Sequence, residues 1–238
     1  MRRWPWVLLG LGSLGGLLLA LSGQDDDSGD APRPGGGWYD RDAPARIREL
    51  AAPIEDATGW LRLGDFLVVV AATESGGNQY ACYGIRGATI ADYCPGNNAR
   101  GWFGGRPKSM YAHGYKSLVQ SDPDLIRRNE RWAVATYAWF AYRLRNYWHQ
   151  SRPVNWLAIR RGGASTRLVN DVNEIAEWPN KAPGERSADV RRRMERGCAM
   201  AGLPDSFMYE RAFAPGFSWP GFEGILEILD ARLPEAEA

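Results

Sequence analysis

One carboxylate stands at the end of the most apolar stretch that follows the N-terminal region. An apolar run from Phe66 to Ala72 leads to Glu74, and the residues Ser-Gly-Gly-Asn follow at 75–78. A carboxyl group at the C-terminal end of an apolar helix is desolvated and meets the negative end of the helix dipole, and both effects disfavour its charged form. Such a group suits a general acid that protonates a glycosidic oxygen. The other interpretation is that Glu74 merely ends a core helix and that 75–78 form a C-cap and turn.

Polar and small residues close to Glu74 are candidates for substrate contact. Gly76 and its neighbour let the backbone approach a bulky ligand closely. Ser75 and Asn78 carry groups that can hydrogen-bond sugar hydroxyls or N-acetyl groups. Asp92 is the natural second carboxylate if the reaction is a hydrolysis, because hydrolysing glycosidases generally use a pair of carboxyl groups that flank the scissile bond. The alternative for Asp92 is a solvated loop acid.

Cysteine and histidine residues are few. Cys82 and Cys94 flank a glycine-rich segment, and we expect them to form a disulfide worth about 3 kcal/mol. Cys198 is then left over, either as a buried free thiol or as a partner that changes this pairing. No cluster of Cys and His in the sequence has zinc-site spacing, and His113 and His149 lie far apart, so we assign no metal ligands.

The N-terminal region reads as a targeting segment. Two arginines precede an apolar run at 4–21, which is about long enough to span a bilayer core as a helix. We therefore expect an exported protein of the periplasm or cell envelope, with 1–22 as a cleaved signal peptide, an inner-membrane anchor, or a weak signal anchor that leaves the membrane. The acidic, Gly/Pro-rich stretch after it predicts a flexible linker over 23–45.

Composition narrows the class of partner. The net charge is +1, from 29 basic and 28 acidic side chains, so a nucleic-acid-binding role is not indicated. The chain has 11 Trp and 10 Tyr, which can fill a core or line a groove that stacks on sugar rings. No cofactor motif stands out.

Helical periodicity and stop signals dominate the rest of the chain. The run at 66–75 reads as a helix with Asp65 as its N-cap, although its valine triplet also fits a strand. The residues 79–114 are turn-rich and predict a long irregular loop or a small hairpin. The other expected helices cover 43–52, 124–148, 154–161, 165–174 (or from 166), 187–201 and 222–232.

The segment Ala-Thr-Glu-Ser-Gly-Gly-Asn at 72–78 resembles the E-S-G-x-N segment of soluble-type (SLT) lytic transglycosylases and goose-type lysozymes. Asp122-Pro123, followed by Asn129, is similar to that family's D-P-x-x-N element, and 157–163 to its A-x-A-Y-N-A-G-P segment. The family's G-L-M-Q segment has no clear match in 84–105. Ile159 stands where the family has a tyrosine, and Tyr137 lies one position from its helix tyrosine.

This resemblance implies a mainly α, lysozyme-like α+β domain at 46–180, divergent and related to phage or prophage enzymes. The residues 181–238 would be a helical, aromatic-rich extension that packs on the domain or recruits a partner. It implies Glu74 as the acid and base of a transglycosylase that cleaves the MurNAc–GlcNAc β-1,4 bonds of peptidoglycan, with Tyr137 as a substrate contact. The alternatives are a hydrolysing muramidase that uses Asp92 and a non-catalytic, membrane-tethered wall-binding protein.

Overall fold

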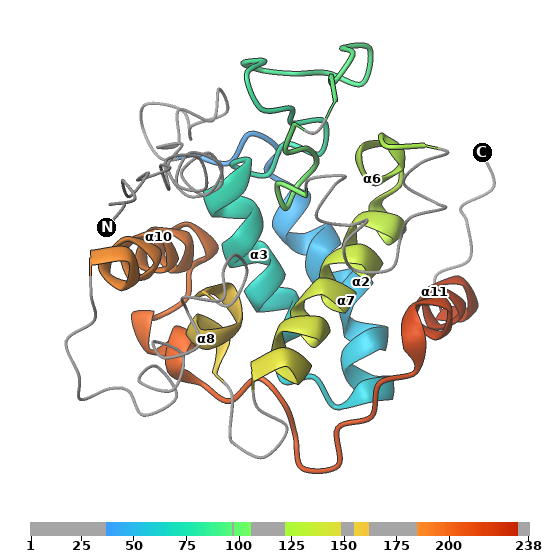
Figure 1. The fold of residues 1–238 in the computed structure, drawn as a ribbon, viewed down its shortest axis with the longest axis vertical. Helices are drawn as coiled ribbons and strands as arrows, with labels where there is room; N and C mark the ends of the chain where they lie inside the picture. Colours follow the sequence, from blue (N-terminus) through green and yellow to red (C-terminus); the bar gives the residue numbers. More distant parts are fainter. Residues whose placement is uncertain (1–36, 97, 106–121, 149–154, 162–184, 233–238) are drawn as a thin grey trace, which may run out of the picture.

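The fold is mainly helical, in agreement with the sequence-based expectation (Figure 1). A computed structural model describes residues 37–96, 98–105, 122–148, 155–161 and 185–232. The predicted membrane segment at 4–21, the expected helix at 165–174 and both histidines lie outside these ranges. The described elements are α2 (Ala43–Thr58), α3 (Leu63–Glu74), α6 (Leu125–Arg128), α7 (Glu130–Trp148), α8 (Trp156–Arg161), α10 (Glu185–Ala201), the 3-10 helix η2 (Asp205–Tyr209) and α11 (Gly221–Arg232).

Helix α3 lies at the centre of the molecule, with α2, α7 and α10 packed around it (Figure 1). Its residues from Leu63 to Ala72 are all buried except Asp65. A helix that is apolar on every side has to be surrounded by other elements, and this is the arrangement seen. The strand alternative for the valine triplet is therefore wrong, because three neighbouring helices bury the segment.

The start of α3 differs from the predicted cap. The helix begins at Leu63, after Arg62 in a left-handed conformation with φ 62°, and Asp65 lies inside the first turn. The Glu55 carboxylate of α2 takes the place of the cap by accepting the Gly64 N–H at 2.7 Å. Burial raises the pKa of Glu55, while this hydrogen bond acts in the opposite direction. A cap supplied by another helix has no local sequence signature, so the prediction for Asp65 was wrong.

Helix α2 is longer than predicted. The expected end before Pro53 is wrong, since the helix continues to Thr58 with Pro53 inside it. An interior proline costs a helix about 3 kcal/mol. Here Pro53 and Ile54 are both buried in the core, and that burial offsets the loss. The helix ends at Gly59, whose left-handed φ of 81° turns the chain towards α3.

The helix predicted at 124–148 is divided in two. Asn129 has an extended backbone (φ −129°, ψ 112°) between α6 and α7. Its side-chain oxygen accepts the Trp132 N–H at 3.2 Å, which is the geometry of an N-cap. The apolar spacing continues across the break, and for this reason periodicity alone did not reveal it.

Residues from the C-terminal region belong to the same core as α3. Helix α10 contacts α3 through Gly197, where an added Cβ would lie 2.7 Å from the Val69 carbonyl oxygen. The side chains of Phe207, Phe213 and Phe222 are buried in that core, which confirms the expectation that these aromatic residues pack. The described part of 181–238 therefore helps to enclose the helix that ends at Glu74.

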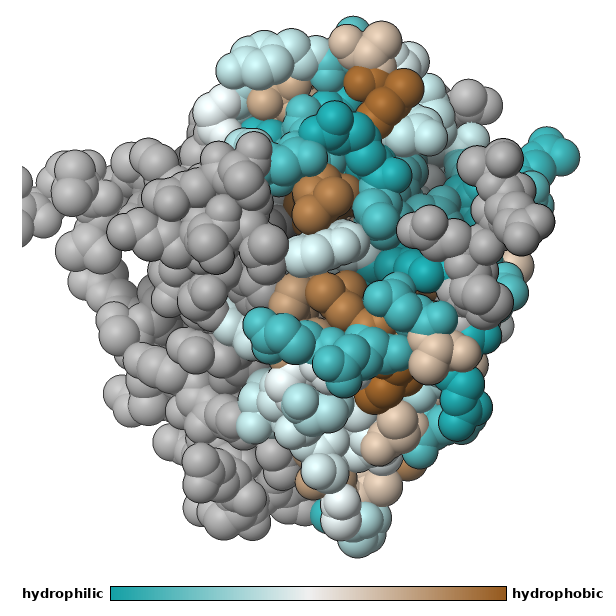
Figure 2. Space-filling view, turned by 90° about the vertical axis from the view of Figure 1, so that its right-hand side faces the viewer, coloured by the Kyte–Doolittle hydropathy of each residue, from teal (hydrophilic) through white to brown (hydrophobic). Residues whose placement is uncertain are grey.

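The surface on the side of α6 and α11 is mixed in character. Figure 2 shows apolar side chains there in small separate areas between hydrophilic ones. Within the described ranges, no helix has both the length and the apolarity needed to cross a bilayer.

Candidate active site

Glu74 is the last residue of α3, and its side chain is 25% exposed. Its Oε1 accepts a hydrogen bond in an ion pair with Arg160 of α8. Tyr137 of α7 hydrogen-bonds the same guanidinium and interacts electrostatically with Glu74. A carboxylate, a guanidinium and a phenol from three helices therefore meet at the end of the buried helix.

A tight turn lies directly over the Glu74 carboxylate. Gly104 has φ 63°, and a Cβ built on it would lie 2.7 Å from Oε2 of Glu74. The turn is closed by the Gly104 N–H bonding the Gly101 carbonyl at 3.3 Å. Only a glycine gives both the left-handed backbone and the space that the carboxylate needs. The backbone of this turn is thus one wall of the site.

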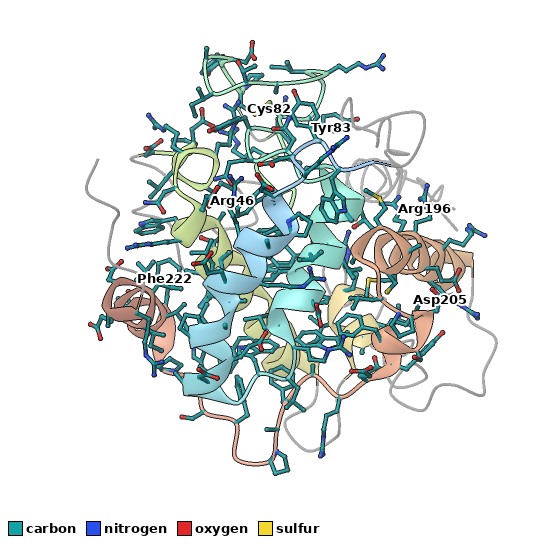
Figure 3. The ribbon with its side chains drawn as sticks, turned by 180° about the vertical axis from the view of Figure 1, so that it is seen from behind. Arg46, Cys82, Tyr83, Arg196, Asp205 and Phe222 are labelled. Atoms are coloured by element: carbon teal, nitrogen blue, oxygen red, sulfur yellow. A yellow bond between two sulfur atoms is a disulfide. The ribbon has the colours of Figure 1, made fainter. Side chains whose placement is uncertain are left out.

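Contacts from two sides hold this turn in place. Ser75 Oγ donates to the Trp102 carbonyl at 2.9 Å, and so joins the turn to the end of α3. Arg46, a residue of α2 that Figure 3 labels, lies over the Trp102 ring at 5.7 Å from its centroid and pairs with Asp40. The Phe103 ring contacts Tyr137 at 5.1 Å between centroids. The turn and the phenol are therefore positioned together.

Helix α8 holds Arg160 by burying its other face. Trp156 is fully buried and stacks on Phe66 of α3 at 4.5 Å and on Trp60 at 5.5 Å between centroids. Asn155 accepts the Ala158 N–H at 2.8 Å and so caps the helix, which begins two residues later than predicted. The side chain of Arg160 is 19% exposed, so it reaches the surface from a fixed helix.

Glu74 and Arg160 balance each other's charge in the site. Burial would lower the pKa of Arg160, but the charge of Glu74 and the contact with Tyr137 raise it above its ordinary value. Arg160 is therefore a permanent cation. Burial raises the pKa of the Tyr137 phenol, and Arg160 opposes that effect. Tyr137 is consequently a neutral hydrogen-bonding group near pH 7.

The residues after Glu74 that were predicted to contact substrate mainly form hydrogen bonds to the protein's own backbone. Ser75 is buried and is engaged by the Trp102 carbonyl. Asn78 is buried, donates to the Ala88 carbonyl at 3.1 Å and accepts the Tyr80 N–H at 2.9 Å. The Gly76 carbonyl accepts the Tyr39 N–H at 2.7 Å. These bonds give the segment an observed role in shaping the turn, while sugar binding by its side chains stays a prediction.

Gln79 is the exception in this segment. Its side chain is buried, and neither its Oε1 nor its Nε2 has a partner among the described residues. Leaving one buried polar group unsatisfied costs about 1–3 kcal/mol, so such groups are rare in folded proteins. Nothing in the local sequence pattern around Gln79 predicts an amide without partners.

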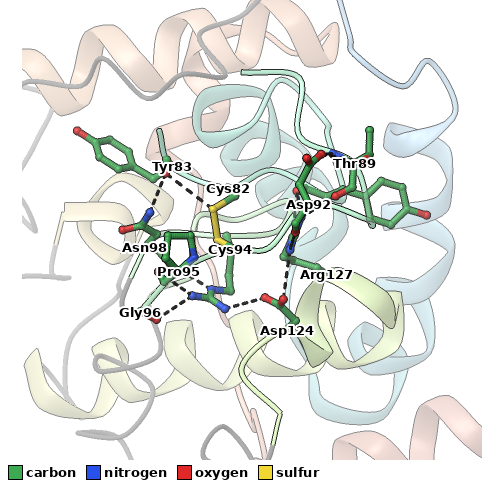
Figure 4. The surroundings of a disulfide bond; sticks show 12 residues. Cys82, Tyr83, Thr89, Asp92, Cys94, Pro95, Gly96, Asn98, Asp124 and Arg127 are labelled. Atoms are coloured by element: carbon green, nitrogen blue, oxygen red, sulfur yellow. Dashed lines mark hydrogen bonds and ion pairs between the residues drawn. A yellow bond between two sulfur atoms is a disulfide. The ribbon is translucent and has the colours of Figure 1, made fainter. Parts of the chain in front are cut away.

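The loop after Glu74 is stapled by the predicted disulfide between Cys82 and Cys94, which the structure confirms (Figure 4). Its described residues form isolated β-bridges, such as Arg100 with Gly105, in place of the strands of a hairpin. Arg127 of α6 is completely buried and donates to the Tyr80 carbonyl at 2.8 Å and to two further loop carbonyls. The disulfide and the hydrogen bonds from Arg127 therefore both hold the loop in place.

Asp92 lies within this stapled loop. Its carboxylate accepts the backbone N–H of Thr89 at 2.7 Å and the Thr89 hydroxyl at 2.8 Å (Figure 4). Those two hydrogen bonds, with a smaller contribution from the charge of Arg127, lower the pKa of Asp92. The group is exposed and takes part in its own turn, which is the geometry of a solvated loop acid.

Two residues of the site were missed by sequence reasoning. Arg160 was overlooked because Ile159, its neighbour, is the residue that aligns with the tyrosine of the A-x-A-Y-N-A-G-P segment. The phenol beside Glu74 comes instead from Tyr137 on another helix. Gly104 belongs to Gly-Trp-Phe-Gly at 101–104, and a pair of glycines around two aromatic residues is a usable turn signal. Long-range contact with Glu74 is not visible in either local pattern.

Comparison of the chain with protein-family models, curated proteins and solved structures gave no match.

Proposed function

We propose that the protein is a peptidoglycan lytic transglycosylase with a lysozyme-like domain, and that Glu74 is its single acid and base. One observation carries the proposal: the carboxylate at the end of the buried helix α3 reaches the surface beneath the Gly104 backbone. The E-S-G-x-N resemblance assigns that position the role of proton donor.

In the proposed reaction, Glu74 gives a proton to the oxygen that leaves the MurNAc–GlcNAc bond. The carboxylate then removes a proton from the C6 hydroxyl of MurNAc, whose oxygen closes a 1,6-anhydro ring. Before a strand binds, Arg160 and Tyr137 hold the carboxylate in place through their shared contact. The missing side chain of Gly104 leaves the space that the Glu74 carboxylate occupies. The protein is proposed to act in the cell envelope, where 4–21 would direct it.

A muramidase needs a second carboxylate beside the substrate, and Asp92 was the candidate. The two hydrogen bonds from Thr89 already engage its carboxylate in the loop. This favours a reaction with one catalytic acid, and therefore transglycosylation over hydrolysis.

A non-catalytic wall-binding protein is the second candidate, and the Arg160 ion pair favours it. The guanidinium already engages Oε1 of Glu74, which fits a contact that holds the fold together. On this reading the end of α3 is a binding surface for glycan strands, and the ion pair is structural.

Digestion of purified sacculi by the full-length protein, followed by mass spectrometry, separates these functions. The proposal predicts soluble muropeptides that end in 1,6-anhydro-MurNAc. Reducing MurNAc ends would indicate a muramidase. Binding to insoluble sacculi with no released product, unaffected by Glu74→Gln, would overturn the catalytic proposal in favour of wall binding.

A further inference from the structure

We infer that Arg160 is the receptor for a carboxylate on the substrate, and that the lactyl carboxylate of MurNAc takes the place of Glu74 on this guanidinium when a strand binds. This inference rests on the proposed function and names the form of substrate that the site selects: glycan whose MurNAc residues carry free carboxylates. In such strands the lactyl group has no stem peptide attached.

The Glu74–Arg160 ion pair is accessible from the surface. The two side chains are 25% and 19% exposed, in contrast to the fully buried Arg127 and almost fully buried Arg100 of the neighbouring loop. Arg127 of α6 and Arg100 of the loop are both engaged by backbone carbonyls. Arg160 is thus an arginine at the end of α3 that a ligand can reach without unfolding the loop.

Moving the Arg160 guanidinium away from Glu74 has an electrostatic cost. A cation withdrawn from its partner into a partly buried site would be left uncompensated, which is strongly unfavourable. An exchange of one carboxylate for another avoids this cost, because Arg160 keeps an anionic partner throughout. Arginine is suited to the exchange, since its planar fork binds carboxylates through paired N–H groups. Tyr137 can keep its own hydrogen bond to the guanidinium.

Helix α8 need not move for this exchange of carboxylates. Trp156, Leu157 and Ile159 are buried, so the helix is fixed against the core. Only the flexible side-chain torsions of Arg160 have to change. The exchange releases the Glu74 carboxylate from its cation at the moment when the substrate is in place, which links strand binding to the freeing of the acid.

The substrate class follows from the chemistry of the glycan. The lactyl ether is on MurNAc, the sugar whose glycosidic bond the proposed reaction breaks. Its carboxyl group is a charged acid in a peptide-free strand and a neutral amide where a stem peptide is attached. Only the charged form can replace Glu74 on Arg160, so peptide-free strands are the preferred ligand.

The test measures binding in full-length Glu74→Gln, which is not expected to cut. The two probes are a peptide-free GlcNAc–MurNAc tetrasaccharide and the same compound with its carboxyls converted to methylamides. Titration calorimetry should show about tenfold or greater preference for the carboxylate probe. Wild-type protein should show a smaller preference, because Glu74 competes for the guanidinium. Adding Arg160→Met or Arg160→Gln to Glu74→Gln should abolish the preference.

Equal binding of the two probes by Glu74→Gln would overturn the inference. So would a preference that persists in the Glu74→Gln variant with Arg160 replaced. Two uncharged replacements are used so that a folding defect in one leaves the other informative. Because none of these measurements depends on cutting, failure of the inference is distinguishable from failure of the transglycosylase proposal, which would appear as an absence of anhydro products from sacculi.

Discussion

The contact between Gly104 and Glu74 makes Gly104→Ala a sensitive probe of the site. The new Cβ would lie 2.7 Å from Oε2 of Glu74, where ordinary contacts begin at 3.4 Å, so the carboxylate or the turn has to move by about 0.7 Å. Gly87→Ala is the matched control. Its φ of 65° nearly equals the 63° of Gly104, and a Cβ added there would lie 3.8 Å from the Tyr39 hydroxyl, which is an ordinary contact.

The two variants separate backbone strain from collision. A left-handed alanine costs about 1–2 kcal/mol in either place. Gly104→Ala adds an overpacking cost of about 1–3 kcal/mol. A displacement of 1 Å in a catalytic group can cost about a hundredfold in rate, so a shift of the expected size should lower kcat about tenfold or more. Gly87→Ala should keep the wild-type rate.

Urea unfolding gives the stability of each variant, and release of soluble fragments from sacculi gives the rate. We expect Gly104→Ala to be the less stable of the two and the only one with impaired release. If both variants unfold alike and both cut at the wild-type rate, then the turn does not press on Glu74 and the described site geometry is refuted.

The remaining predictions concern the frame around the site. Gly197→Ala should lower the free energy of unfolding by about 1–3 kcal/mol, because the added Cβ would lie 2.7 Å from the Val69 carbonyl oxygen. Urea unfolding tests this, with Arg196→Ala at an exposed position as the control. Equal stability of the two variants would contradict the α10–α3 contact. Burial raises the pKa of Cys198 from 9.0 to about 12, so the protein should lose stability as the pH rises from 9 towards 12. Thermal unfolding should show a smaller loss for Cys198→Val. An identical pH dependence of the two proteins would be evidence against a contribution from the Cys198 thiol. Reduction of the Cys82–Cys94 disulfide should cost about 3 kcal/mol, measured by unfolding with and without reductant, and an unchanged midpoint would show that the staple contributes nothing.

Local patterns predicted the elements of the fold better than their ends. The apolar run that leads to Glu74 identified the central helix, since a segment without a polar face has to be buried. Pro53 and Asn129 were misjudged for opposite reasons. Core burial kept α2 helical through a residue that usually ends helices, while a side-chain cap broke a continuous apolar pattern.

The candidate site was predicted only in part for a related reason. Glu74 stands out in the sequence because it follows a long apolar run. Arg160 and Gly104 lie 86 and 30 positions away from it along the chain, and their importance depends on how α8 and the loop pack against the end of α3. Contacts of that kind are set by the tertiary structure and leave no spacing rule in one sequence.

Fragment release from purified sacculi by wild-type protein and by Glu74→Gln tests the central claim most directly. The substitution keeps the size of the side chain and its ability to hydrogen-bond Arg160, but it removes the proton that the reaction needs. Circular dichroism and thermal unfolding establish that the variant is folded. We predict that wild-type protein releases anhydro-muropeptides and that Glu74→Gln is slower by about a hundredfold or more. Equal release by the two proteins would contradict the assignment of Glu74 as the catalytic acid.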